Sequence, residues 1–265
     1  MSKNVVFWIG VKNKNQELIS KGRYGDFEWM DYSKQTWKYW CKKNDVEFIE
    51  YTTPSNPDIL NYRVTWQRYI DVYDYIENRL KDYNQILLTD ASIMIKWDAE
   101  NIFNKSDHKF CGFRGDENMS WLYDSISGYQ DLFPNQSFNW DRIIMGGLTL
   151  FNKSHKLFFN TFKEFFNINY STLMNKQNNT VKKGTDQPVL NWLLQREKID
   201  VKFLNRKTAI NHLYRFNLLD LDSITQRPLF IDNVDLWIFS GFPDRGNTRT
   251  SLMKQTWDIV KENYE

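Results

Sequence analysis

The sequence is short of the residues and patterns on which several protein classes depend. It has two cysteines among 265 residues, so a disulfide framework is excluded and a buried core must hold the fold. Its 35 Lys and Arg balance 33 Asp and Glu, which argues against a general nucleic-acid binder. No apolar run approaches the ~20 residues of a transmembrane helix, and none resembles an export signal. These absences predict a cytoplasmic protein with reduced thiols.

The motifs of several enzyme classes are missing as well. The sequence has no nucleophile elbow, P-loop or dinucleotide-binding glycine pattern. His108, His155 and His212 lack the paired spacing of zinc ligands, which disfavours metal hydrolase chemistry. Cys41 lies on an apolar helical stripe, and a buried thiol of this kind is inert.

What the sequence does contain is a regular alternation of strand and helix patterns. Apolar runs at residues 5–11 and 85–90 predict strands, and helical spacing of apolar residues predicts helices over 27–43 and 59–81. We predict further strands at 47–51, 93–95, 109–113, 143–151 and 201–204, and helices at 154–166, 186–196 and 250–264. Residues 115–139 are expected to form a loop and a short helix, and residues 167–184 a polar, mobile segment. This order is typical of an α/β protein with a mainly parallel sheet.

Candidate functional residues lie where predicted strands end, because open α/β sheets bind ligands beyond the carboxyl ends of their strands. Asp90 closes the strand in Leu-Leu-Thr-Asp-Ala-Ser, where a carboxylate is suited to hold a divalent cation and, through it, a diphosphate. The alternative is an ordinary turn aspartate. Gly146 and Gly147 interrupt the strand at 143–151, which indicates either a bulge or a close approach of the backbone to a ligand.

Two later segments offer further polar groups. Thr185 is a candidate cap for the helix at 186–196, which would place Asp186 and Gln187 at the positive helix end. The alternative is a capping segment without further role. Ser240 and Gly241 could donate hydrogen bonds to a phosphate, with Arg245 as the counter-charge; the alternative is a surface turn.

In this order, the segments resemble a glycosyltransferase of the GT-A fold, and in particular glycosyltransferase family eight and its relatives. The Thr-Asp-Ala-Ser segment at 89–92 stands at the place of the Asp-X-Asp metal motif, and Trp-Gln-Arg at 66–68 precedes it on a helix. Residues 145–152 resemble the family's Asn-Ala-Gly-Val strand, 185–191 its Asp-Gln segment, and 236–241 its late His-Phe-Ser-Gly segment. The resemblance covers nearly the whole chain.

The resemblance implies a GT-A, Rossmann-like single domain over residues 1–265, with a mixed, mainly parallel central sheet flanked by helices. Residues 1–114 would form the nucleotide-binding half, 115–235 the acceptor and catalytic half, and 236–265 a C-terminal loop and helix. Two departures concern the metal: Ser92 stands where the family has its second acid, and Ile238 replaces a metal-binding histidine. Asp90 and Ser92 are therefore expected to bind Mn²⁺ or Mg²⁺ weakly, unless Asp116 or Asp124 completes the site.

The activity implied is transfer of a sugar from a nucleotide-diphosphate sugar to a glycan, polysaccharide or other hydroxyl acceptor, with metal assistance and retention of configuration. Asp186 and Gln187 would lie at the reacting centre, and an inverting reaction would use Asp124 or Asp186 as base. The expected donor-binding residues are Phe7, Gly10, Arg68, Asp90, Ala91, Ser92, Gly146, Gly147, Ser240, Gly241 and Arg245.

Two other functions stay open at this stage. The lost metal ligands allow a non-catalytic protein that binds a glycan or a nucleotide on the same fold. A nucleotidyltransferase is disfavoured, because residues 11–16, after the first strand, contain no glycine.

Aromatic residues are abundant, with 11 Trp, 14 Tyr and 19 Phe, and several of them fall on predicted helix stripes that form the core. A group in the irregular stretch before the Gly146–Gly147 strand does not. Its rings would form either a stacking platform for an acceptor glycan or a small satellite core. The group consists of Trp121, Tyr123, Tyr129, Phe133, Phe138 and Trp140.

Overall fold

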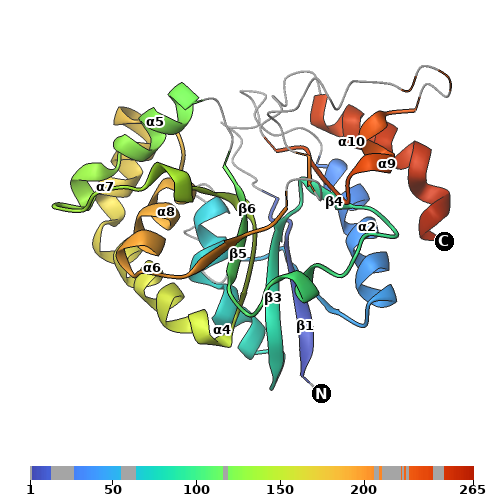
Figure 1. The fold of residues 1–265 in the computed structure, drawn as a ribbon, viewed down its shortest axis with the longest axis horizontal. Helices are drawn as coiled ribbons and strands as arrows, with labels where there is room; N and C mark the ends of the chain where they lie inside the picture. The colour runs from blue at the N-terminus through green and yellow to red at the C-terminus, as the bar shows by residue number, and fades with distance from the viewer. Residues whose placement is uncertain are drawn as a thin grey trace.

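The computed structural model describes residues 2–12, 27–54, 64–115, 119–205, 209–210, 222, 224, 227–240 and 248–265. Its centre is a six-stranded sheet, which the helices flank on two sides (Figure 1). The strands lie in the order β2 (Glu47–Tyr51), β1 (Lys3–Ile9), β3 (Tyr83–Asp90), β6 (Ile144–Asn152), β5 (Phe110–Arg114) and β7 (Val201–Phe203).

The sheet is mixed and mainly parallel. Strand β1 pairs in parallel with β2 and β3, and β5 with β7, whereas β6 is antiparallel to both of its neighbours. A second, three-stranded sheet has the order β4 (Ile93–Ile95), β9 (Leu236–Ile238) and β8 (Ala209–Ile210). The predicted α/β class and sheet type are confirmed.

Both faces of the central sheet are buried, as the continuous apolar run in β1 predicts. Val5, Phe7 and Ile9 point to one face, whereas Val6 and Trp8 point to the other, because successive side chains of a strand alternate. The first face is covered by α3 (Gln67–Ile70), α4 (Val72–Glu77), α5 (Met119–Ser127), α6 (Lys156–Ile168), α7 (Tyr170–Asn175) and α8 (Asp186–Arg196). The second is covered by α2 (Trp29–Lys43), α9 (Leu229–Asn233) and α10 (Thr248–Val260).

Buried tryptophans hold α2 in place. The indole N–H groups of Trp37 and Trp40 donate to the carbonyls of Ile93 and Ala99, at 2.8 and 3.0 Å. Each ring thus contributes apolar burial while its one polar group stays bonded, which avoids the cost of an unpaired buried donor. Cys41 lies on the same buried stripe, and burial raises the pKa of its thiol, as expected for an inert cysteine.

The prediction of one long helix over 59–81 is wrong, because the described part of this segment is divided into shorter elements. From residue 64 the chain forms a 3₁₀ turn over Val64–Trp66 and then α3 and α4, which are separated at Asp71. Asp71 is buried and accepts a hydrogen bond from the hydroxyl of Tyr51 on β2, so this contact with the sheet edge fixes the break. The apolar stripe that helical spacing predicts is buried at Trp66, Ile70, Tyr73 and Ile76 and partly buried at Leu80. Residues 59–63 lie outside the described ranges.

Two further expectations need correction. Residues 167–184, expected to be mobile, contain α7 and a π-helical turn over Lys176–Thr180, because buried Gln177 accepts a hydrogen bond from the Trp66 indole at 2.8 Å. Helical spacing in the sequence predicts that Leu157 lies on the apolar face of α6 with Phe158 and Phe162. Leu157 is instead exposed, and the buried stripe comprises Phe158, Phe159, Phe162, Phe165 and Phe166.

The turn that opens α6 contains a partly buried histidine. His155 Nδ1 accepts a hydrogen bond from the backbone N–H of Asn152 at 3.3 Å, as part of a capping box, and its ring packs on Phe110. Burial lowers the pKa of His155 from its usual 6.5. The folded protein therefore holds the neutral ring, which an accepting Nδ1 requires.

We expect this histidine to make folding stability fall in mild acid. A histidine whose pKa is lowered by folding contributes stability that is complete above its unfolded pKa and is lost as the pH falls below it. The melting temperature should therefore drop more between pH 7.5 and 5.5 in the wild type than in His155→Asn, which retains an acceptor but does not titrate. Equal pH dependence in the two proteins would contradict this assignment.

Candidate active site

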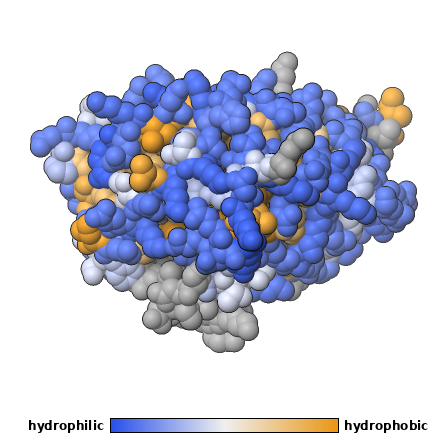
Figure 2. Space-filling model, turned by 90° about the horizontal axis from the view of Figure 1, so that it is seen from below, coloured by the Kyte–Doolittle hydropathy of each residue, from blue (hydrophilic) through white to orange (hydrophobic). Residues whose placement is uncertain are grey.

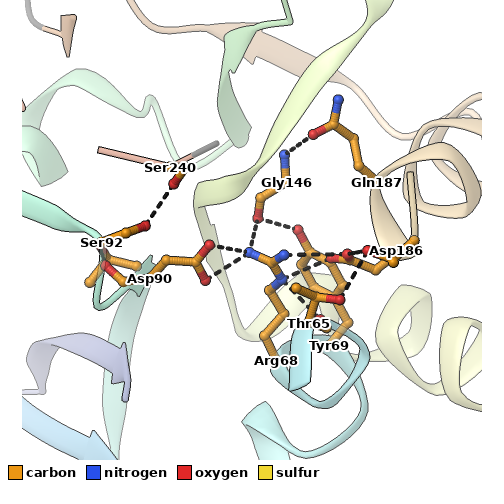
Figure 3. Close-up of polar contacts among 11 residues, drawn as sticks. Thr65, Arg68, Tyr69, Asp90, Ser92, Gly146, Asp186, Gln187 and Ser240 are labelled. Carbon is orange, nitrogen blue, oxygen red and sulfur yellow. Dashed lines mark hydrogen bonds and ion pairs between the residues drawn. The ribbon is translucent and has the colours of Figure 1, made fainter. Parts of the chain in front are cut away.

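A buried arginine joins three parts of the chain beyond the carboxyl end of β3. Arg68 Nη1 donates to both carboxylate oxygens of Asp90, at 2.8 and 2.9 Å, and to the carbonyl of Gly146 at 3.0 Å. Its Nε lies 2.8 Å from Asp186 Oδ2. Figure 3 shows the guanidinium between the two carboxylates, with the Gly146 carbonyl beside it. We call Arg68, Asp90 and Asp186 the charge cluster.

The charge cluster carries one net negative charge in a buried place. Burial alone would lower the pKa of Arg68, but the charges of Asp186 and Asp90 raise it above the usual value, so the guanidinium stays charged. Burial raises the pKa of Asp90, and the charge of Arg68 opposes this effect. The side chain of Asp90 is 25% exposed and that of Asp186 2%, so Asp90 is the member that a ligand can reach.

Neighbouring hydroxyls and amides complete the cluster. Tyr69 donates to the Gly146 carbonyl at 2.6 Å, and Gln187 Oε1 accepts from the Gly146 N–H at 3.1 Å. The hydroxyl of Thr185 donates to Asp186 Oδ1 at 2.7 Å and makes no helix-capping bond, so the predicted capping role is wrong. Thr65 contacts Thr185 at 3.0 Å. Sequence patterns gave no sign of Thr65 or Tyr69.

Space around the glycine pair is limited by the cluster itself. A Cβ atom built on Gly147 would lie 3.0 Å from Asp90 Oδ2, and one on Gly146 would lie 3.3 Å from the Tyr69 hydroxyl. The pair therefore allows the carboxylate and the phenol to approach the backbone of β6. These two close contacts explain the presence of both glycines without a ligand.

The remaining predicted donor residues fall into two groups. Phe7 is fully buried against Tyr51 and Tyr75, and Ala91 is buried with its N–H bonded to the carbonyl of Ile9 at 2.9 Å. Gly10 donates its N–H to Tyr51 at 3.0 Å. Ser92 and Ser240, by contrast, meet near the cluster, with their hydroxyl oxygens 2.7 Å apart. Gly241, Arg245 and Asp116 lie outside the described residues.

Asp124 is not part of this constellation in the contacts described. It lies on α5, where its carboxylate is half-exposed and forms an ion pair with Lys183. An acid held by a surface lysine is a poor candidate for a base at a reacting centre.

Among the described residues, the side chains do not supply a full set of ligands for Mn²⁺ or Mg²⁺. Within the described part of the chain, no three His, Cys, Asp or Glu side chains gather closely enough to hold a metal ion. Asp90 is already neutralised by Arg68, Ser92 is bonded to Ser240, and Ile238 is fully buried opposite Ile93 in the second sheet. One paired carboxylate is a small charge for a hard divalent cation.

Comparison with known proteins gives a structural relationship but no family. No protein-family model matches the sequence, and no curated protein matches it significantly. Among solved structures, the chain is similar to a glycosyltransferase involved in the glycosylation of the major capsid of PBCV-1. The identity is 7% and the TM-score 0.51, and the match covers 96% of this chain and 98% of that one. The chain has a glycosyltransferase fold.

Two structures of galactosyltransferase LgtC match less well. One, in complex with donor and acceptor sugar analogues, has 12% identity and a TM-score of 0.48, with 97% of this chain and 99% of that one covered. The other, an active-site mutant, has the same identity and TM-score, with coverage of 96% and 99%.

Proposed function

We propose that the protein is a glycosyltransferase that moves a sugar from a nucleotide-diphosphate sugar to a hydroxyl of a glycan or polysaccharide. The observation that carries the proposal is the charge cluster, which brings Arg68, Asp90 and Asp186 together beside the Gly146 carbonyl at the ligand edge of the sheet. The glycosyltransferase fold supports it.

The charge cluster suits the sugar better than the diphosphate. Two carboxylates already balance the Arg68 guanidinium, so little positive charge is left for an anion. The partly exposed Asp90 carboxylate can instead accept hydrogen bonds from sugar hydroxyls. The cluster's net negative charge would also stabilise the positive charge that develops on the sugar in an oxocarbenium-like transition state.

The same pairings support retention over inversion. An inverting enzyme needs a carboxylate base that can reach the acceptor hydroxyl. Asp186 is buried against Arg68, and Asp124 is paired with Lys183, so neither is placed for this role. Gln187, on the same turn as Asp186, presents a neutral amide at the proposed reacting face.

The test is incubation of the protein with a panel of nucleotide-diphosphate sugars, with and without a mixed set of oligosaccharide acceptors. We expect one donor to be hydrolysed slowly alone and consumed faster with an acceptor, and the product's anomeric configuration, read by NMR, to match that of the donor. If no donor reacts but a nucleotide sugar raises the melting temperature, the protein is a binding protein instead. The weak metal-ligand set is the observation that favours that second candidate.

Removal of divalent cations should leave most of the transfer activity. The described residues offer one carboxylate for a cation, and Arg68 already pairs with it, so we propose that the metal assistance implied by the resemblance is reduced or lost. Initial rates with EDTA should stay within about threefold of those with Mn²⁺, given that a single carboxylate binds such ions weakly. A rate that EDTA abolishes and Mn²⁺ restores would contradict this.

A further inference from the structure

A pair of exposed aromatic rings lies on the same side of the sheet as α8. Tyr123 on α5 stacks on Trp140, with ring centroids 5.4 Å apart and planes 15° from parallel. Their residues are 59% and 38% exposed, and Met119, one helical turn before Tyr123, is also exposed. The other rings of the predicted aromatic group are buried or partly buried, so the group is split between a core and a surface.

The buried part of the group supports the exposed part. Phe138 packs against Trp140 on one side and Trp192 of α8 on the other, with centroids 5.2 and 4.7 Å apart. Phe133 stacks on Trp192 with planes 7° from parallel, and the Trp192 indole donates to the carbonyl of Ile126 on α5. The exposed ring of Trp140 is therefore supported by a packed aromatic cluster that is anchored to α8 and α5.

A pocket of about 700 Å³ opens between residues 132–142, the segment that contains Trp140, and residues 194–201. Asn139 and Arg142, which flank Trp140 in sequence, both contribute to its wall. The volume is within the roughly 300–1,000 Å³ range of ligand sites. The wall is about half polar and half apolar, and its polar side chains include the amides of Asn135, Gln136 and Gln195.

Positive charge dominates this pocket. Arg142, Arg196 and Lys198 line it together with one carboxylate, Asp200, and Arg196 is paired with Glu197 at 2.7 Å. Asp200 is itself paired with Lys109 at 2.7 Å, and the charges of Lys109 and Arg142 hold the pKa of its carboxyl below the usual range. An anionic ligand would therefore meet a net positive wall.

Helix α8 connects this surface to the charge cluster. Gln187, Asn191 and Gln195 are spaced four residues apart on one face of the helix, and each bonds the backbone of residues 139–146. From Asp186 to Leu194, at the pocket, the helix rises about 12 Å at 1.5 Å per residue. A short oligosaccharide can span such a distance.

We infer that Tyr123, Trp140 and the adjacent pocket bind the distal part of an acceptor glycan that carries acidic sugars. This inference rests on the proposed function, since it names the acceptor class of that same site. Exposed ring faces stack on the C–H faces of sugars, and amide and guanidinium groups bond hydroxyls and carboxylates. Two rings and one methionine offer a few hundred Å² at most, short of the ~800 Å² per partner of a standard protein interface.

The inference can be tested by glycan binding without any donor. An array of neutral and uronic-acid-containing oligosaccharides is probed with the wild type, Trp140→Ala and Tyr123→Ala. Leu157→Ala, which truncates an exposed apolar side chain on α6, is the matched control. We expect the wild type and the control to bind acidic oligosaccharides, and each ring variant to bind them about tenfold more weakly, as loss of a stacked ring implies. Melting curves confirm that the variants are folded.

Other outcomes overturn the inference in distinguishable ways. If the wild type binds no glycan, or if both ring variants bind as well as the control, the surface is not an acceptor site. If neutral glycans bind as well as acidic ones and Arg142→Gln changes neither, the acidic preference is wrong. Donor hydrolysis without acceptor reports on the proposed function separately, and the Leu157→Ala control should leave it unchanged.

Discussion

Arg68→Met is expected to abolish sugar transfer and to lower the free energy of unfolding by about 3–5 kcal/mol, the cost of breaking a buried ion pair by removing one partner. The substitution leaves Asp186 buried and Asp90 partly buried without their shared cation. It also removes the Nη1 bond to the Gly146 carbonyl, which holds β6 against the cluster. Urea denaturation gives the stability, and the donor panel gives the activity.

A double variant separates the loss of stability from the loss of activity. In Arg68→Met/Asp186→Asn the buried charge at position 186 is gone, so we expect a part of the lost stability to return while activity stays absent. Arg68→Lys keeps a charge but not the planar group that reaches both carboxylates, and it should be intermediate in stability. Wild-type stability in Arg68→Met would show that the cluster is not a buried ion pair in solution.

The second large effect that we expect is the loss of folding stability in Asn191→Leu. Asn191 is fully buried on α8, where its side chain accepts from the N–H of Ile144 at 2.8 Å and donates to the carbonyl of Ile144 at 3.0 Å. Leucine is similar in size but leaves both backbone groups unpaired, at about 1–3 kcal/mol each. We therefore expect a loss of roughly 2–6 kcal/mol, measured by urea denaturation.

The activity of this variant would test whether the contact between α8 and β6 positions the candidate active site. Ile144 lies two residues before Gly146, so a shift of β6 here would move the backbone that contacts Arg68 and Tyr69. We expect kcat to fall more than donor affinity. Asn175→Leu is a control, because Asn175 lies on α7 and not among the α8 side chains that bond the backbone of residues 139–146. It should leave both stability and kcat near wild type. Equal losses in the two variants would show that Asn191 has no special role.

The elements that the sequence predicts well are those whose signals are local. Helix α8 has the predicted bounds because its start is marked by neighbours in sequence: Gly184 adopts a positive φ of 67°, and Pro188 follows in the first turn. Strand β1 is recognisable because its apolar run reflects burial on both faces.

The features that were missed depend on partners far away in the sequence. The break between α3 and α4 needs Tyr51, 20 residues before Asp71, and the charge cluster joins Arg68 to Asp186 across 118 residues. The strand-end position of Asp90 could be predicted, but its pairing with Arg68 could not. Likewise, helical spacing alone does not distinguish the exposed Tyr123 from the buried Tyr129.

The last segment of the chain has a consequence for biosynthesis. Helix α10 packs on α2, the Tyr264 hydroxyl donates a 2.5 Å hydrogen bond to the carbonyl of Ile95, and β9 completes the sheet that β4 begins. Roughly 200 residues separate α2 from α10, which at about 5–20 residues per second is some 10–40 s of translation. The face of α2 that α10 covers, which includes Tyr32 stacked on Trp257, is therefore uncovered on the ribosome for that time, so a chaperone that shields it would raise the yield of folded protein more than one acting after release.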